Sequence, residues 1–201
     1  MKIYYFSDES FLDMKNKFEY SFKDNFEKKF KYLDNVNLDR NQPGSGIDIW
    51  KYKTSMIINA IKENKNDIIL VSDIDIIFYR PVEKIIEQCM INTDCCFQKE
   101  TSTSGINIGF ISIRCNESML YFWNIVNEKV CNTNVWDQEI VNDLIYNKKE
   151  KIRWGLFPSS VWNWSQGDLN KSIILHHANC VSKKEEKYEQ MEYVYNYINN
   201  E

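Results

Sequence analysis

A short apolar run in the middle of the chain, "DIILVSDID" (67–75), constrains the fold more than any other segment. The run is rich in Ile and Val, which is typical of a strand that is covered on both faces. Strands of this kind occur in parallel sheets whose connections run through helices. The run therefore predicts a central strand of an α/β domain.

Segments on both sides of this run alternate between strand-like and helix-like patterns. The sequence predicts further strands at residues 2–6, 26–34, 94–98, 105–115 and 172–177. It predicts helices at residues 9–20, 47–63, 81–90, 116–130, 137–147 and 183–200, and a loop at residues 41–46. Pro81 suits the first position of its helix. The alternation indicates one α/β domain over residues 1–201, with a mostly parallel sheet flanked by helices, which can form part of a longer chain.

Composition excludes several classes of protein. With 43% hydrophobic and 27% charged residues, the chain has the composition of an ordinary soluble domain. A net charge of −4 argues against a general nucleic-acid binder. We expect no signal peptide, because the start "MKIYYFSDES" lacks a long apolar stretch, and no membrane span. The six cysteines form no CxxC pair, so we expect reduced, packed thiols and a cytoplasmic protein.

Two aspartates, Asp73 and Asp75, stand at the carboxyl end of the central strand, where open α/β sheets bind ligands. Side chains two residues apart on a strand point to the same face, and close carboxylates disfavour each other's charge unless a cation lies between them. Their oxygens suit Mg²⁺ or Mn²⁺, which keep positions open for phosphates. The spacing favours a metal that holds a phosphate-bearing substrate. The alternative is a solvated strand end with two ordinary acids.

The order of short motifs along the chain adds a resemblance to this interpretation. "SDIDIIFYRP", "GINIGFISIR", "DQE" and "LHHAN" follow one another within residues 3–187. This order resembles the GT-A type nucleotide-diphospho-sugar glycosyltransferases with an Asp-x-Asp motif, including compact domains of large DNA viruses. The resemblance implies a GT-A-like fold and transfer of a sugar from a UDP-sugar to the hydroxyl of a glycan or other acceptor. It also implies an Mn²⁺ or Mg²⁺ cofactor, and the host cytoplasm as location if the chain is viral.

The resemblance assigns the metal site to three residues. Asp73 and Asp75 match the Asp-x-Asp pair that binds the metal and the nucleotide diphosphate, and His177 matches the late histidine that completes the site. Strand alternation lets only one of His176 and His177 face the site. Asn179 stands two residues after His177, as in the family, so the resemblance favours His177.

The turn after the first predicted strand, "YFSDES", resembles the nucleotide-binding turn of the family. The resemblance places Tyr5, Ser7 and Asp8 against the uracil and the ribose. A helix cap formed by Asp8 or Ser10 is the competing interpretation, and both can hold.

Basic residues at two positions match those that approach the phosphates in the family. Lys53 precedes the aspartates at a suitable spacing, whereas its neighbour Trp50 is expected in the core. Lys184 and Lys187 follow the histidines where relatives place a diphosphate-contacting base. A solvated helix face is the alternative for "KKEEK".

The remaining matches concern the sugar and the acceptor. Asn107 and Gly109 match an Asn-x-Gly that lines the donor-sugar pocket, where a glycine allows a close backbone approach. Asp137 in "WDQE" matches the acid that faces the sugar and the acceptor, and it could instead cap a helix. Trp162 and Trp164 could stack on sugars or belong to the core.

Two other functions remain open at the level of sequence. "ILVSDIDIIF" superficially resembles the haloacid-dehalogenase phosphatases, in which the first aspartate is a nucleophile. That motif normally opens its domain, and here Asp73 lies far from the start. A non-catalytic module that binds a carbohydrate or a nucleotide sugar is the second alternative.

Overall fold

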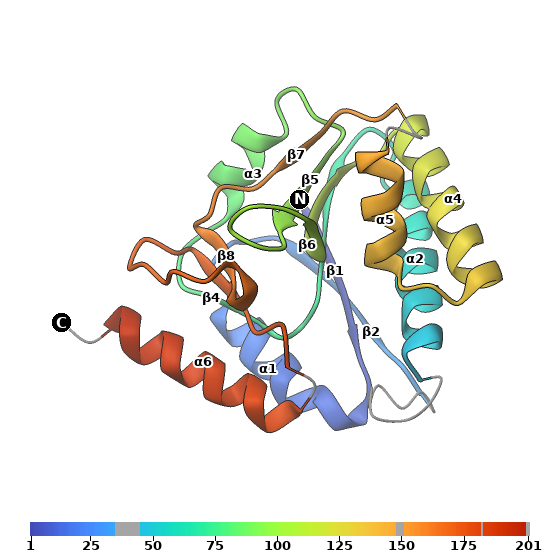
Figure 1. Cartoon of the computed structure of the whole chain (residues 1–201). Helices are drawn as coiled ribbons and strands as arrows, with labels where there is room; N and C mark the ends of the chain where they lie inside the picture. The colour runs from blue at the N-terminus through green and yellow to red at the C-terminus, as the bar shows by residue number, and fades with distance from the viewer. Residues whose placement is uncertain (35–44, 148–150, 182, 200–201) are drawn as a thin grey trace.

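The computed structural model describes residues 1–34, 45–147, 151–181 and 183–199, which form two sheets with helices around them (Figure 1). The large sheet has the strand order β2-β1-β3-β6-β5-β7. Its strands are β1 (Lys2–Ser7), β2 (Glu27–Tyr32), β3 (Ile68–Ser72), β5 (Cys95–Lys99), β6 (Ile106–Arg114) and β7 (Trp154–Leu156). The small sheet has the order β4-β9-β8, with β4 (Ile76–Phe78), β8 (Val161–Asn163) and β9 (Leu175–His177).

Most strands of the large sheet run in the same direction. β1 pairs in parallel with both β2 and β3, and β5 pairs in parallel with β7. β6 is antiparallel to its neighbours β3 and β5. The prediction of a mostly parallel sheet is confirmed, and β6 begins at the edge of the sheet where β3 ends.

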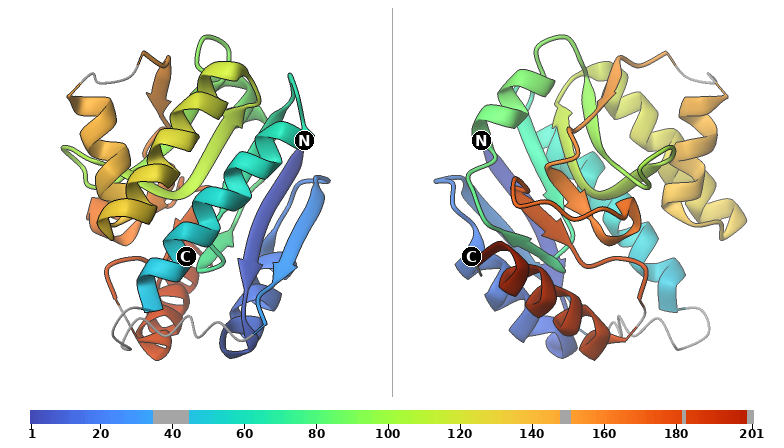
Figure 2. Two further views of the ribbon diagram at one scale, coloured as in Figure 1. Left: turned by 90° about the vertical axis from the view of Figure 1, so that its right-hand side faces the viewer. Right: turned by 60° about the vertical axis from the view of Figure 1, so that its left-hand side comes forward.

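Helices cover both faces of the large sheet. They are α1 (Leu12–Ser21), α2 (Ser45–Glu63), α3 (Glu83–Cys89), α4 (Glu117–Thr133), α5 (Asp137–Tyr146) and α6 (Lys184–Asn199), with short 3-10 turns η1 (Glu9–Phe11) and η2 (Trp164–Gln166). α2, α4 and α5 lie together on one side, and α1 and α6 lie on the other (Figures 1 and 2). The result is a three-layer α/β sandwich.

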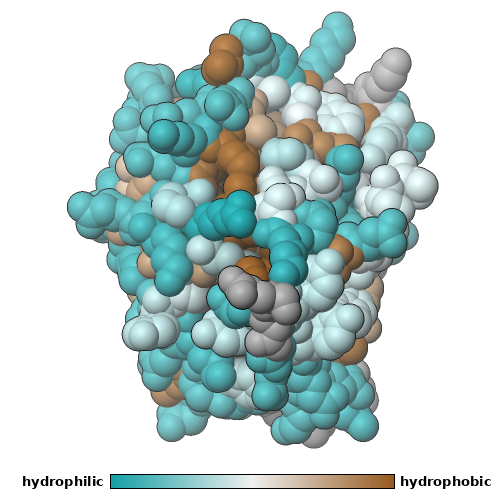
Figure 3. Space-filling view, turned by 90° about the vertical axis from the view of Figure 1, so that its left-hand side faces the viewer, coloured by the Kyte–Doolittle hydropathy of each residue, from teal (hydrophilic) through white to brown (hydrophobic). Residues whose placement is uncertain are grey.

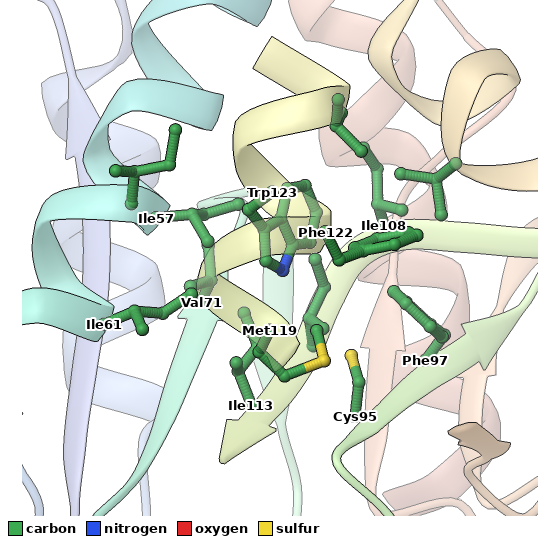
Figure 4. Packing of buried hydrophobic residues seen from close by; sticks show 14 of the residues in the cluster. Ile57, Ile61, Val71, Cys95, Phe97, Ile108, Ile113, Met119, Phe122 and Trp123 are labelled. Atoms are coloured by element: carbon green, nitrogen blue, oxygen red, sulfur yellow. The ribbon is translucent and has the colours of Figure 1, made fainter. Parts of the chain in front are cut away.

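Strand alternation divides the core into two clusters, one on each face of the sheet. Tyr4 and Val71 pack with α2, α4 and α5, whereas Ile3, Tyr5 and Leu70 pack with α1 and α3. Figure 4 shows part of the first cluster, in which aromatic rings of α4 lie between α2 and the strands. Because both faces are covered, β3 is apolar along nearly its whole length, as the run at 67–75 predicts.

Several strands and helices begin or end at other residues than the sequence predicts. β3 ends at Ser72, so the two aspartates lie in the turn that follows the strand. β9 is three residues long and begins later than the predicted strand at 172–177. The predicted loop at 41–46 falls outside the described residues up to 44, and its last two residues already belong to α2.

Pro81 does not open its helix. α3 begins at Glu83, with Val82 as the capping residue. The carboxylate of Asp24 accepts hydrogen bonds from the backbone N–H groups of Val82, at 2.9 Å, and Glu83, at 3.1 Å. A residue distant in sequence therefore satisfies the first donors of this helix, which local sequence patterns could not indicate.

The last helix, α6, contacts the rest of the protein through a narrow stripe. Met191 and Val194 are buried, whereas the neighbouring Tyr195 is 57% exposed. Figure 3 shows that this side of the molecule is mainly hydrophilic, with hydrophobic residues visible in a narrow strip near its middle. Among the described residues, no helix combines the length and the apolar character that crossing a membrane requires.

Candidate active site

A cleft of about 400 Å³ lies where β3 ends and β6 begins. Its walls come from the β3–β4 turn, the start of β6, the start of α5, the end of β9, and side chains of α2 and α6. This is the carboxyl edge of the parallel strands, where ligands bind in open α/β folds. The predicted site residues that line it are Lys53, Asp73, Asp75, Asn107, Gly109, Asp137, His177 and Lys187, and Asn179 lines it as well.

Three potential metal ligands meet at one point of the cleft. One ligand atom each from Asp73, Asp75 and His177 can be chosen so that all lie within 4.8 Å of one another. Backbone hydrogen bonds fix the turn, because the N–H of Asp73 donates to Gly109 O at 2.7 Å and that of Ala178 to Asp75 O at 2.8 Å. The predicted convergence is therefore present, although a turn produces it and strand alternation does not.

Two lysines neutralise the aspartates. Lys53 on α2 is buried, with its Nζ 2.6 Å from Asp73 Oδ1. Lys187 on α6 places its Nζ 2.5 Å from Asp75 Oδ2 and donates to Ala178 O at 2.7 Å. Burial alone would raise the pKa of Asp75, but the attraction of Lys187 and His177 outweighs burial and holds this pKa well below its ordinary value. Asp75 is therefore a carboxylate at neutral pH.

The ring of His177 is held in one orientation. Its Nδ1 lies 3.0 Å from Gln98 Oε1, and the amide of Gln98 is oriented by donating to Val161 O at 3.3 Å. The contact with Gln98 places a proton on Nδ1, so a neutral ring would turn the lone pair of Nε2 toward Asp75 Oδ1, 3.3 Å away. Two acceptor atoms that face each other at this distance suit a cation between them.

Gly109 makes room for this ring. A Cβ atom at position 109 would lie 2.2 Å from Cε1 of His177, a distance that no side chain tolerates. The sequence interpretation, that glycine allows a sugar to approach the backbone, thus misses a requirement that lies within the protein itself. Any substitution of Gly109 displaces His177.

His176 points to the opposite face of the small sheet. It pairs across the sheet with Ile77 and Trp162, and its ring lies 5.2 Å from that of Trp162. Burial, followed by repulsion from His177, lowers the pKa of His176 to about 3, so the ring is neutral. Of the two adjacent histidines, only His177 reaches the cleft.

The other end of the cleft is built around a bulge between β5 and β6. The pairing slips after Phe97, so that Gln98 faces Asn107. The slip frees the backbone N–H groups of Ile108 and Gly109, which donate to the side chains of Gln138, at 3.2 Å, and Asn107, at 2.8 Å. Bulges often lie next to active sites, where they redirect side chains.

Asp137 opens α5 at this end of the cleft and is 2% exposed. Its Oδ1 accepts a hydrogen bond from the N–H of Gln138 at 2.9 Å. Two further residues that were not predicted, Gln138 and Glu100, also line the cleft. Gln138 directly follows Asp137 in "WDQE", so this motif could have indicated it. No pattern in the neighbouring sequence indicates Glu100.

The structure does not bring the predicted nucleotide-binding residues Tyr5, Ser7 and Asp8 to the described lining of the cleft. Tyr5 is fully buried, packs on Phe18 with ring centroids 4.9 Å apart, and donates its hydroxyl to Glu19. The physical reason is strand alternation, which turns odd-numbered residues of β1 toward α1.

Ser7 and Asp8 are also buried and belong to the turn itself. The Ser7 hydroxyl donates to Asp8 O at 2.9 Å, and Asp8 Oδ1 accepts from the Ser10 hydroxyl at 2.7 Å. Asp8 occupies the capping position of η1 without a side-chain hydrogen bond to its backbone. Phe6, on the other face of β1, lines the cleft in place of Tyr5.

Lys184 and the predicted stacking tryptophans also lie elsewhere. Lys184 pairs with Asp13 of α1 at 2.6 Å. Trp162 is 2% exposed and belongs to the core, and Trp164 packs on Tyr193 of α6. The tryptophans that line the cleft are Trp136 and Trp50, the second of which also packs in the core as expected.

Comparisons with known proteins identify the family and the fold of the chain. The model of the nucleotide-diphospho-sugar transferase family matches residues 40–191. A search of curated proteins gives no match. The chain resembles the structure of a glycosyltransferase involved in glycosylation of the major capsid of PBCV-1, with TM-score 0.67 and 14% identity over 96% of this chain and 100% of that one.

Two further structures show the same fold. GlyE of Streptococcus pneumoniae gives TM-score 0.62 and 13% identity over 96% of this chain and 60% of GlyE. The galactosyltransferase LgtC, solved with donor and acceptor sugar analogs, gives TM-score 0.53 and 12% identity over 90% of this chain and 87% of LgtC. These likenesses establish the α/β fold of the GT-A glycosyltransferases. Because the family model covers more than half of its length, the chain belongs to the nucleotide-diphospho-sugar transferase family and is a glycosyltransferase.

Proposed function

We propose that this glycosyltransferase moves a sugar from a UDP-sugar to a hydroxyl of a glycan or other acceptor, with Mn²⁺ or Mg²⁺ bound by Asp73, Asp75 and His177. The convergence of these three side chains within 4.8 Å, at the edge of the sheet where ligands bind, carries the proposal. Two carboxylate oxygens and one imidazole nitrogen form a donor set that suits Mn²⁺ in particular.

The surroundings of the three side chains support a divalent ion. Nε2 of His177 faces Asp75, and the hydrogen bond between Nδ1 and Gln98 fixes this orientation of the ring, as outer partners do at metal sites. When bound, the ion would neutralise the charge that develops on the leaving diphosphate. Lys53 and Lys187, which contact the aspartates, stand close enough to contact phosphate oxygens as well.

The nucleobase has a suitable place beside the aspartates. A smaller hollow of about 100 Å³ adjoins Asp73 and Asp75 and is lined by apolar side chains that include Phe6 and Phe11. Aromatic rings provide flat, apolar contact for a pyrimidine. We therefore assign contact with the base to Phe6 and Phe11, and we withdraw Tyr5, whose ring lies in the core.

The sugar would occupy the part of the cleft beyond the metal site. Asn107, Gly109 and Asp137 line this part, together with Trp136. Asp137 would deprotonate the acceptor hydroxyl if the configuration inverts, or orient the donor sugar if it is retained. The anomeric configuration of the product, determined by NMR, distinguishes these two roles.

Membership of a transferase family removes the main support for the two alternative functions. In the dehalogenase-type phosphatases the aspartate motif opens the domain, whereas here β1, α1, β2 and α2 precede Asp73. A module without catalytic function would not need the complete Asp73, Asp75 and His177 set.

Cysteine chemistry supports a cytoplasmic location, the host cytoplasm for a viral chain. All six cysteines are free, and Cys95, Cys96 and Cys115 are buried. Burial raises the pKa of the Cys95 thiol well above its ordinary value, so it stays protonated and unreactive. Free, packed thiols are typical of reducing compartments.

A thermal-shift screen of nucleotides and nucleotide sugars, each with Mn²⁺ and with EDTA, tests the proposal. Ligand at a hundredfold excess over its Kd stabilises a protein by about 2.7 kcal/mol, or roughly 5–10 °C for a chain of this size. We expect UDP and at least one UDP-sugar to raise the melting temperature only when Mn²⁺ is present. An absence of any shift with the whole panel would refute the proposal.

A further inference from the structure

Glu100, which follows β5, presents a carboxylate to the sugar end of the cleft. Its Oε2 accepts two hydrogen bonds, from Asn107 Nδ2 at 2.7 Å and from Gln138 Nε2 at 3.1 Å. These donors come from β6 and α5, two different walls of the cleft. The carboxylate therefore joins the elements that enclose the sugar pocket.

The two amide donors have no alternative orientation. Gly109 N–H donates to the oxygen of the Asn107 amide, and Ile108 N–H donates to the oxygen of the Gln138 amide. Each amide must therefore turn its NH₂ group toward Glu100. Both NH₂ groups need an acceptor at this point, and an ionised carboxylate offers acceptors only.

The backbone of Glu100 is fixed as firmly as its side chain. Its N–H donates to Gly105 O at 3.0 Å, and the hydroxyl of Ser165 donates to its carbonyl oxygen at 2.5 Å. Gly105 has a φ of +87°, and a Cβ there would lie 2.8 Å from the Cβ of Glu100. Within the described ranges Oε1 of Glu100 has no protein partner, so this oxygen is available to a ligand.

Charge is distributed unevenly along the cleft. Lys53, His177 and Lys187 all gather at the metal end, where they face the two aspartates. At the sugar end the titratable side chains among the described lining residues are two acids, Glu100 and Asp137. An anionic sugar would thus meet the carboxylate of Glu100, whose contacts among the described residues are two amide groups and no cation.

We propose, on the basis of the transferase function proposed above, that Glu100 determines donor specificity. Its Oε1 accepts a hydrogen bond from a sugar hydroxyl, and its charge excludes uronic acids, so that the donor carries a neutral hexose. A neutral sugar supplies the hydroxyl donor that Oε1 lacks. A uronate would place a second carboxylate beside that of Glu100, and like charges in a binding site repel each other.

The variant Glu100→Gln separates charge from shape. Its amide oxygen can take the place of Oε2 and accept from Asn107 and Gln138, while its NH₂ group takes the place of Oε1 and faces the sugar. Binding of UDP, UDP-glucose, UDP-galactose, UDP-glucuronate and UDP-galacturonate is measured by calorimetry with Mn²⁺ for both proteins. Glu139→Gln removes the same charge from an exposed position on α5 and serves as control.

We expect the wild type to bind a neutral UDP-hexose at least tenfold more tightly than the matching uronate. Glu100→Gln should lower this ratio about tenfold or more, with UDP affinity and melting temperature unchanged, and Glu139→Gln should not alter the ratio. Equal wild-type affinity for neutral and uronic donors, or an unchanged ratio in Glu100→Gln, would overturn the inference alone. Failure of UDP itself to bind with Mn²⁺ would overturn the proposed function and this inference with it.

Discussion

Two aspartates at strand ends, Asp75 and Asp94, look similar and serve different purposes. Both are largely buried, both contact a cationic side chain, and both have a pKa below the ordinary value. Asp94 directly precedes β5, and its two oxygens accept hydrogen bonds from the Arg153 side chain, the Arg153 backbone N–H and the Asn116 amide. Each oxygen of its carboxylate therefore accepts two hydrogen bonds.

Asp75 has partners of another kind. Lys187 and His177 each approach one oxygen, at 2.5 and 3.3 Å, and the carboxylate lines the cleft beside Asp73. A guanidinium fork fixes a carboxylate in one geometry, whereas single ammonium and imidazole contacts leave room for a ligand. A lowered pKa is thus common to both aspartates, and Asp75 differs in that neighbouring acceptor atoms converge beside it in the cleft.

The largest effect in the cleft is expected for Asp137→Asn. The amide keeps the oxygen that accepts from Gln138 N–H, so folding and UDP binding should remain normal. Loss of the carboxylate should lower sugar transfer about a hundred- to ten-thousandfold, measured as turnover per folded molecule. Glu139→Gln, on the outer face of the same helix, is the matched control. A variant that loses only stability would reduce Asp137 to a structural residue.

The adjacent histidines provide the second test. His177→Ala removes a proposed metal ligand and should weaken Mn²⁺-dependent UDP binding at least about tenfold, because loss of an outer partner of a ligand alone costs about ten- to hundredfold. His176→Ala should leave UDP binding intact and lower the free energy of unfolding by about 2 kcal/mol, because it opens a cavity beside Trp162. Calorimetry and denaturant unfolding measure the two effects. The opposite pattern would show that the wrong histidine has been assigned to the cleft.

The smallest effect concerns Asp94, the structural member of the pair. Asp94→Asn should lower the free energy of unfolding at pH 7 by about 1–2 kcal/mol, because Arg153 loses its charged acceptor. UDP binding should not change. Hydrogen bonds from Arg153 lower the pKa of Asp94 in the folded protein, so its stabilising contribution is complete above the unfolded value of about 3.9.

The same linkage predicts how the effect depends on pH. As the pH falls from 3.9 through the lower pKa of the folded state, the contribution of Asp94 is lost and the wild type approaches the variant. Urea unfolding at pH 7 and near pH 3 measures the difference. A constant difference at both pH values would mean that Asp94 contributes by shape and not by charge.

Local patterns predicted most elements of the fold. The apolar run at 67–75 and the periodic helices specify their structure through neighbouring residues, so their approximate positions are correct. β4, β7 and β8 escaped prediction, because each has only three residues and depends on pairing with another segment of the chain. The end of β3 at Ser72 was misplaced for a similar reason, since the turn is held by Gly109 and Ala178.

Candidate site residues that stand in recognisable motifs were predicted, and residues that only the tertiary structure brings to the cleft were missed. Asp73, Asp75 and His177 stand in short motifs, and the structure brings them together. Tyr5 does not line the cleft, because strand alternation turns its side chain into the core and places that of its neighbour Phe6 in the cleft. Glu100 could not be recognised, since its position depends on the slip between β5 and β6.

The central claim is that Asp73, Asp75 and His177 hold a divalent ion that in turn holds the nucleotide. Calorimetry of UDP binding, in Mn²⁺ and in EDTA, tests it directly with the wild type and with Asp75→Ala. The account predicts wild-type binding at least about tenfold tighter in Mn²⁺, or 1.4 kcal/mol, and no such gain in Asp75→Ala. Equal UDP affinity of the wild type in Mn²⁺ and in EDTA would contradict it.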